Sequence, residues 1–236
     1  RSRSLAMQKP EELVEVAVLL REEMGHLGVE ELETSSIYIV DNENNQAECW
    51  FAIKDIREVS KQLVSDEMTI TLNDTWVGNE MWKFYTSKKE QASIVMKGDS
   101  RKEWINYCGN QSQVLQGYYG NEIPERTYHL VKFNGGYMGA ASPGAISSES
   151  WDLLKRAAAV FSFAYTRFKD LQDAAARARE AQIELALERV RSRSMAMHKS
   201  DELIEAGEIL FLEMQKLGIE SLTAGYVLIE KKKKNG

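Results

Sequence analysis

The sequence lacks most of the features that would assign a chain directly to one class of protein. Its 236 residues contain two cysteines, Cys49 and Cys108, whose separation matches neither a zinc site nor a redox pair. No apolar run approaches the ~20 residues of a membrane span, and no signal-peptide pattern is present. The motifs G-x-S-x-G, H-E-x-x-H and the P-loop are also missing. We therefore expect free thiols in a reducing cytoplasm, no membrane insertion, no metal site, no evident cofactor and no catalysis by this chain.

An excess of basic residues is missing as well. Asp and Glu number 36 against 30 Lys and Arg, which gives a formal charge of −6 at pH 7. General affinity for nucleic acid needs a basic face, so we expect no nucleic-acid partner. The composition that is present, with 43% hydrophobic and 28% charged residues, is typical of a soluble globular protein. A chain of this length holds one large or two small domains.

Glycine and proline are absent from residues 147–199. A stretch of this length without either residue predicts one long helix or two nearly collinear helices. At ~1.5 Å per residue such a helix would extend roughly 75 Å, which is more than a small domain needs. We therefore expect its first half to belong to a globular domain and its second half to lead out of that domain.

The sequence repeats itself at an interval of 190 residues. Residues 1–32 align without a gap with residues 191–222, and 18 of 39 positions are identical when the comparison continues to Ile39 and Ile229. Such self-similarity predicts a parent protein that carries the unit at least twice, so we expect this chain to be a piece of a longer protein. The predicted divisions are the end of a preceding connector helix at 1–9, a complete domain at 10–170, a connector helix at 171–199 and the start of a second, truncated repeat at 200–236.

The order of the predicted elements indicates the fold class. Pro10 marks the start of an amphipathic helix that ends at Gly28, and Ser200 would cap the corresponding helix of the second repeat. Asn134-Gly135 predicts a tight turn with positive φ angles between two strands. The other predicted segments are strands at 35–41, 48–55, 66–72 and 91–96, helices at 77–88 and 101–115, a hairpin at 126–141, and the long helix, capped by Ser147 or Ser148. This order predicts an α+β fold, with an antiparallel sheet, flanking helices and a long C-terminal helix of coiled-coil type.

Seven-residue spacing along the long helix predicts a coiled-coil seam. One series is Leu154, Phe161, Phe168 and Ala175, and a second is Ala157, Ala164, Leu171, Ala178 and Leu185. An isolated helix is marginal in water, so the pattern favours a parallel homodimer. The predicted dimer and relay residues are Phe161, Phe168, Leu171, Ala175, Ala178 and Leu185. The alternative is a first half that serves the domain's own core and a second half that is a charged monomeric spacer.

Two segments carry a resemblance to a known family. The hairpin ending GGYMGAAS, followed by ISSESWDLLKRAAAVFSFAYTRFKDLQDA, resembles the last strand and exit helix of GAF domains, the small ligand-sensing modules of bacterial signalling proteins. The stretch REAQIELALERVRSRSMAMHKSDEL is similar to the connector of multi-domain sensor histidine kinases. The resemblance implies a GAF-like or related PAS-like fold, a cytoplasmic location, a role in two-component signal transduction, adjacent domains of the same chain as partners, and a small-molecule ligand.

The sequence departs from the ligand motifs of some members of that family. Bilin-binding members resemble one another in a Cys-His pair, whereas Cys49 is followed by Trp50 and Cys108 by Gly109, so covalent bilin attachment is not expected. The signature of cyclic-nucleotide-binding members is not matched either. Among the histidines, only His129 falls in the predicted sheet, and a strand histidine satisfied by its neighbours is the expected role rather than a haem ligand.

Aromatic residues are concentrated between Trp76 and Tyr119. In a GAF-like fold this segment would form a wall over the sheet, and aromatic side chains with polar tips suit a small-molecule pocket. The predicted ligand-binding residues are Trp76, Trp82, Tyr85, Trp104, Tyr107 and His129. The alternative is that these rings simply fill the core.

These observations lead to two functional hypotheses. The first is a non-catalytic sensory module that relays a small-molecule or conformational signal through a dimeric exit helix. The second is a degenerate GAF-like domain that binds nothing and acts as a structural dimerisation spacer.

Overall fold

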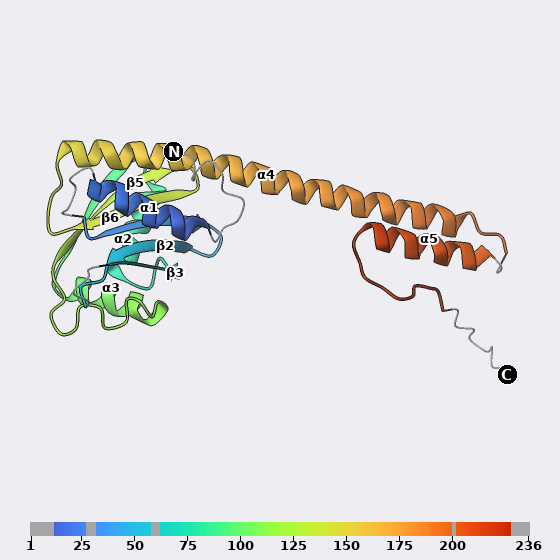
Figure 1. The fold of residues 1–236 in the computed structure, drawn as a ribbon, viewed down its shortest axis with the longest axis horizontal. Helices are drawn as coiled ribbons and strands as arrows, with labels where there is room; N and C mark the ends of the chain where they lie inside the picture. Colours follow the sequence, from blue (N-terminus) through green and yellow to red (C-terminus); the bar gives the residue numbers. More distant parts are fainter. Residues whose placement is uncertain (1–11, 27–31, 58–61, 200–201, 228–236) are drawn as a thin grey trace. The chain divides into compact units, whose positions relative to one another are not determined.

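The computed structural model describes residues 12–26, 32–57, 62–199 and 202–227 (Figure 1). The chain divides between Phe168 and Lys169 into two compact units, which we describe separately. The first unit contains α1 (Glu12–His26), β1 (Thr34–Asp41), β2 (Gln46–Lys54), β3 (Leu63–Thr71), α2 (Trp76–Thr86), β4 (Gln91–Met96), α3 (Gly98–Gln111), β5 (Arg126–Phe133), β6 (Gly136–Ser142) and the first part of α4 (Ser148–Met195). The second unit contains the rest of α4 and α5 (Leu203–Lys216).

The predicted α+β class is confirmed, with three local corrections. Helix α3 ends at Gln111 rather than at residue 115, because the chain turns at Ser112 into extended backbone. Helix α4 ends at Met195 rather than near residue 199, and the backbone N–H of His198 donates to the carboxylate of Glu202 instead of to a helical carbonyl. In the turn between β5 and β6 only Gly135 has a positive φ, of 91°.

Some predicted features lie outside the described residues. They are the connector end at 1–9, the helix start at Pro10, the helix end at Gly28 and the cap at Ser200.

The six strands form one antiparallel sheet in the order β3-β2-β1-β6-β5-β4. Strands β1 and β6 come from opposite ends of the domain and pair at the centre, where Tyr38 lies opposite Tyr137. Gly136 makes this close pairing possible, because a Cβ atom at this position would lie 1.8 Å from the carbonyl oxygen of Tyr38. A larger residue at position 136 would force the two central strands apart.

Helices cover both faces of the sheet and bury a separate core on each side (Figure 1). Helices α2 and α3 pack on one face, and α1 and the first part of α4 pack on the other. Successive residues of a strand point to opposite faces, so neighbours along β1 enter different cores: Tyr38 packs under α2 and α3, and Ile37 packs under α1 and α4. The central strands are therefore shared by two interiors.

The first part of α4 is a core helix of its own domain. The hydroxyl of Ser147 accepts the backbone N–H of Ser150 at 3.1 Å, as an N-cap does, so the predicted cap is confirmed at Ser147. The ring of Phe161 meets that of Phe133 on β5 at a centroid distance of 4.9 Å. Phe161 and Phe168 are 2% and 7% exposed. These two predicted dimer residues are therefore occupied by the domain's own sheet and unavailable to a second chain, because a core position and a seam position share nearly the same helical spacing.

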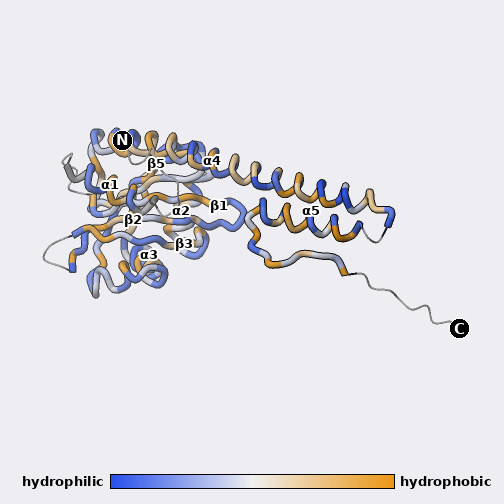
Figure 2. Tube along the Cα trace, turned by 45° about the vertical axis from the view of Figure 1, so that its right-hand side comes forward, coloured by the Kyte–Doolittle hydropathy of each residue, from blue (hydrophilic) through white to orange (hydrophobic). Residues whose placement is uncertain are grey.

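The second unit is a helical hairpin. Ala186 on α4 and Ala206 on α5 are buried. The carboxylate of Glu213 forms ion pairs with Arg189 at 3.1 Å and with Lys216 at 2.6 Å. Arg193 also pairs with Glu205 across the two helices. Figure 2 shows hydrophobic and hydrophilic residues alternating along both helices of this unit.

The other predicted relay residues are not buried in either unit. Leu171, Ala175, Ala178 and Leu185 are all exposed. In the part of the chain that the structure describes, no helix combines the length and apolarity needed to cross a membrane.

Candidate functional site

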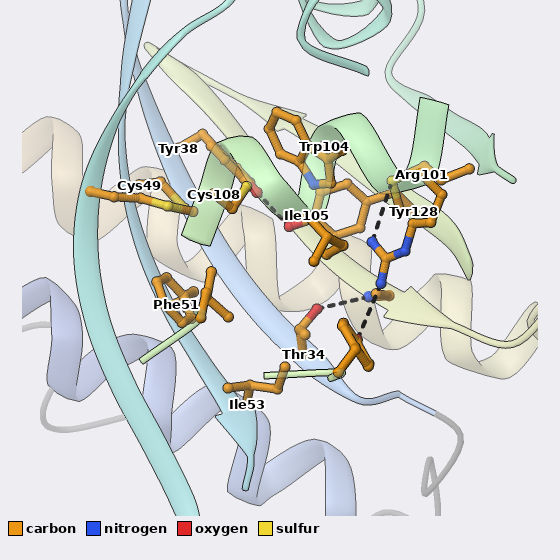
Figure 3. Close-up of a pocket in the computed structure, with 15 residues that line it drawn as sticks. Thr34, Tyr38, Cys49, Phe51, Ile53, Arg101, Trp104, Ile105, Cys108 and Tyr128 are labelled. Carbon is orange, nitrogen blue, oxygen red and sulfur yellow. Dashed lines mark hydrogen bonds between the residues drawn. The ribbon is translucent and has the colours of Figure 1, made fainter. Parts of the chain in front are cut away.

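A cavity of ≈ 50 Å³ lies between the sheet and α3 (Figure 3). Strand residues on one side and helix residues on the other line it. The sheet contributes Thr34, Tyr38, Cys49, Phe51, Ile53, Met68, Met96, Tyr128 and Ala141. Helix α3 contributes Arg101, Trp104, Ile105 and Cys108, and the segment that follows contributes Leu115 and Tyr119. The cavity wall is mostly apolar, with a small number of hydroxyl, thiol and guanidinium groups.

A hydrogen-bonded pair of tyrosines forms the sheet side of the cavity. The hydroxyls of Tyr38 and Tyr128 are bonded to each other, and the Tyr128 hydroxyl is also 2.7 Å from Oγ of Ser36. Burial raises the pKa of both phenols, so both are neutral at pH 7. The pair offers hydroxyl groups to the cavity without adding charge.

Two buried thiols lie on the same cavity. Cys49 comes from β2 and Cys108 from α3, and both are free. Burial raises the pKa of the Cys108 thiol to about 12 and that of Cys49 well above its usual range. Because the thiolate is the nucleophile, neither group is activated for covalent chemistry at pH 7.

Arg101 contributes a buried cation. Its Nε donates to the carbonyl of Pro124 at 3.2 Å, its Nη2 donates to the hydroxyl of Tyr119 at 3.1 Å, and its Nη1 lies 3.8 Å from Sδ of Met96. The residue is only 4% exposed. Burial lowers the pKa of the guanidinium, and arginine nevertheless stays protonated in proteins at pH 7.

A second arginine, Arg126, binds the carboxylate of Glu33 near Tyr119. Arg126 donates to both oxygens of Glu33, with its Nε 2.6 Å from Oε2. This bond raises the pKa of Arg126. The hydroxyl of Tyr119 lies 3.5 Å from the same Oε2, so Tyr119 stands between Glu33 and Arg101. The carboxylate is thus committed to Arg126, and Arg101 reaches it only through a phenol.

The structure places one of the predicted ligand-binding residues, Trp104, on the cavity. Tyr107 stacks beside Trp104 with a ring-centroid distance of 6.0 Å, and its hydroxyl accepts the N–H of Thr71. Trp82 and Tyr85, on α2, are half-buried against the same core without lining the cavity. Trp76 is 45% exposed at the start of α2, because the face of that helix with Val77 and Met81 points inward.

His129 lies on the opposite face of the sheet from the cavity. Alternation along β5 sends Tyr128 to the cavity and its neighbour His129 toward α4, where its ring meets Trp151 at 5.3 Å. Its Nδ1 is 3.0 Å from Oγ of Ser93 and its Nε2 is 2.8 Å from Oγ of Ser142. Burial lowers the pKa of this imidazole. The prediction that His129 joins the other ligand residues is corrected, since both ring nitrogens have partners within the domain.

Sequence reasoning missed Arg101, Tyr38, Tyr128 and the convergence of the two cysteines. Helical spacing carried part of the signal, since residues 101, 104, 105 and 108 repeat at i, i+3, i+4 and i+7 and share one face of α3. Nothing in the local sequence showed that this face would meet Tyr38 and Tyr128, because that meeting depends on the pairing of strands distant in the chain.

Among residues whose side chains are described, no group of three or more His, Cys, Asp or Glu could hold a metal ion. Comparison with protein-family models gives no match for the sequence, and a search of curated proteins gives none.

Proposed function

We propose that the first unit is a GAF-like sensory domain of a cytoplasmic bacterial signalling protein, such as a multi-domain sensor histidine kinase. It catalyses no reaction itself. It binds a small molecule in the cavity under α3, and this binding changes the conformation of α4. The observation that carries the proposal is the sharing of central strands between the cavity and the core of α4. Neighbouring residues Ile37 and Tyr38 face α4 and the cavity respectively.

The coupling runs through strands β1 and β5. The Tyr38–Tyr128 pair touches the cavity, and on β5 Phe133 packs against Phe161 of α4. A ligand that moves the tyrosine pair displaces the backbone of these strands, and the packed side chains on the other face follow. Close-packed interiors respond by changing between discrete arrangements rather than by deforming continuously, which is the behaviour that a relay needs.

We place the dimer contact on the part of α4 that follows Phe168. The proposed seam keeps Leu171, Ala175, Ala178 and Leu185, all of them exposed, and leaves out Phe161 and Phe168 because both are buried. A parallel pair of α4 helices would then transmit a rotation or a slide along its length.

The connection to a following domain goes through α5. By the internal repeat, α5 corresponds to α1, and Glu213 corresponds to Glu23. Ion pairs of Arg189 with Glu213 and of Arg193 with Glu205 hold α5 to the end of α4. A change in α4 would therefore reach the first helix of the next repeat directly.

One observation favours the alternative of a structural spacer. Pockets for drug-sized ligands measure about 300–1,000 Å³, and this cavity is much smaller. A domain that binds nothing would keep a small, well-packed interior of this kind.

A ligand screen with a readout on α4 distinguishes the two functions. The whole chain is screened by thermal shift against metabolites that include neutral, cationic and anionic compounds of up to about ten non-hydrogen atoms. The sensory function predicts a compound that raises the melting temperature and changes hydrogen exchange in peptides from residues 148–195. If no compound does both, the spacer function replaces the sensory one.

A further inference from the structure

Arg101 gives the cavity a net positive charge. It is the single charged side chain among the described residues that line the cavity, and no Asp or Glu is among them. The phenols and thiols around it are neutral at pH 7, since burial raises the pKa of each. Buried charges in proteins are normally paired with an opposite charge, because an uncompensated ion is costly in a low-dielectric interior.

The hydrogen bonds of Arg101 do not provide that opposite charge. A guanidinium has five N–H groups. Their described partners are a carbonyl, a phenol and a thioether, all of them neutral, and the thioether sulfur is a weak acceptor. Two N–H groups therefore have no partner among the described residues. The Nη1 side, which faces Met96, is the one without a strong acceptor (Figure 3).

Glu33, the carboxylate linked to Arg101 through Tyr119, is already paired with another arginine. Glu33 accepts a two-pronged bond from Arg126, and the Arg126–Glu33 pair is outside the set of residues that line the cavity. Counting Arg101, Arg126 and Glu33 together, the described groups carry one positive charge in excess. That excess is located on Arg101, next to an empty volume.

The volume limits the size of what could balance the charge. One water needs roughly 10–15 Å³ of cavity volume, so ≈ 50 Å³ holds about three to five water-sized groups. Formate, nitrate and acetate have three or four non-hydrogen atoms each. A planar oxyanion also matches the fork of a guanidinium, which binds such groups with two parallel hydrogen bonds.

From this geometry we propose that the cavity binds a small monovalent oxyanion, a carboxylate or a nitrate-like ion, with Arg101 as its counter-ion. The inference rests on the sensory function proposed above and names its class of ligand. The oxyanion faces the free N–H groups of Arg101. The mutual bond of Tyr38 and Tyr128 uses one of their two O–H groups, so this pair supplies at most one further donor from the sheet. The apolar wall formed by Ile53 and Ile105 excludes ligands with additional polar groups. A divalent anion is disfavoured, since a single cation would leave it with an uncompensated charge.

Calorimetric titration of the whole chain tests this inference. Sodium formate, acetate and nitrate are titrated in a background of sodium gluconate, an anion too large for the cavity. Formamide and acetamide are the neutral controls of matched size, and succinate is the control for size and charge. The expected result is saturable binding of at least one of the three small anions, with no binding of the amides or of succinate.

Two variants assign the binding to Arg101. Arg101→Met is expected to weaken binding of the anion at least tenfold, whereas Arg156→Met, at an exposed position of α4, should bind it like the wild type. Should Arg101→Met fail to fold, the Nε–H resonance of Arg101 in the ¹⁵N spectrum of the wild-type chain gives a second readout. That resonance is expected to move on titration with the small anions and to stay in place with the amides.

The outcomes separate this inference from the proposed function. If none of the small anions binds, or if Arg101→Met binds them as well as the wild type does, the oxyanion inference is wrong. A neutral ligand that binds and changes hydrogen exchange in α4 would overturn the oxyanion and leave the sensory function standing. Binding of an oxyanion without any change in α4 would support the oxyanion and overturn the relay.

Discussion

Arg101 and Tyr119 hold each other in two ways. Nη2 of Arg101 donates to the hydroxyl of Tyr119 at 3.1 Å, and the guanidinium carbon lies 5.3 Å from the centroid of the same ring. The hydroxyl in turn lies 3.5 Å from Oε2 of Glu33. Tyr119 therefore links a buried cation to the carboxylate of the Arg126–Glu33 pair, and it fixes one edge of the guanidinium at the cavity wall.

Tyr119→Phe separates the two contacts between these residues. The substitution removes the hydrogen-bond acceptor but keeps the ring beside the guanidinium. We expect the free energy of unfolding to fall by about 1–2 kcal/mol, because a buried charged donor loses a partner. Urea denaturation measures this change. Tyr226→Phe, at a more exposed tyrosine of the second unit, is the matched control and should change the value by less than about 0.5 kcal/mol. Equal effects of the two substitutions would contradict the assigned role of Tyr119.

Tyr137→Phe is expected to stabilise the domain. The Tyr137 hydroxyl is fully buried and has no hydrogen-bond partner among the described residues, although its ring stacks on Tyr38 at 4.8 Å. Removing an unsatisfied hydroxyl while keeping the ring should raise the free energy of unfolding by about 1 kcal/mol. Tyr38→Phe provides the opposite case, since it leaves the Tyr128 hydroxyl without its bonded neighbour and should lower stability by a similar amount. A higher melting temperature for Tyr38→Phe than for Tyr137→Phe would contradict these two assignments.

The Cys108 thiol should make the domain less stable at alkaline pH. In the unfolded chain a thiol ionises near pH 9, whereas burial raises the pKa of folded Cys108 to about 12. Between these values the unfolded chain has released a proton that the folded chain retains, so the free energy of unfolding falls as the pH rises from about 9 toward 12. Cys108→Ala should make this decline shallower relative to the wild type. Ionisation of the buried phenols and of Cys49 also lowers the free energy of unfolding as the pH rises. The relevant measurement is therefore the difference in slope between the wild type and Cys108→Ala. Parallel slopes would show that Cys108 does not titrate in this way.

The sheet could be predicted from the sequence because its signals are local. Alternating apolar residues marked the strands, and Asn134-Gly135 marked the last hairpin, even though only the glycine adopts a positive φ. The cavity could not be predicted, because Tyr38 and Tyr128 meet only after β6 pairs with both β1 and β5. Aromatic density between Trp76 and Tyr119 pointed to α3, which lines the cavity with Trp104, but also to α2, which does not line it and turns Trp76 outward.

The long helix shows a second limit of sequence reasoning. A core helix that packs on a sheet repeats about every 3.6 residues, and a coiled-coil seam repeats every 3.5, so a short helix fits both patterns. Phe161 and Phe168 satisfied the seam pattern and yet pack against the sheet of their own domain. Only the position of the sheet decides between the two assignments.

Phe161 and Phe163 turn this distinction into a test. Phe161 is 2% exposed and packs on Phe133, whereas Phe163, two residues along the same helix, is 65% exposed. Phe161→Ala should lower the free energy of unfolding by about 3–5 kcal/mol, because it opens a cavity in the core. Phe163→Ala should change stability by less than about 0.5 kcal/mol at fixed oligomeric state. If α4 pairs with a second chain as proposed, Leu171→Ala, at an exposed residue of the proposed seam, should shift the dimer toward monomer at micromolar concentration, as measured by light scattering after size-exclusion chromatography. Thr166→Ala, at a neighbouring residue of the same helix, serves as the control and should keep the oligomeric state of the wild type. A wild-type chain that is monomeric at these concentrations would remove the dimeric relay and leave α4 with its core role alone.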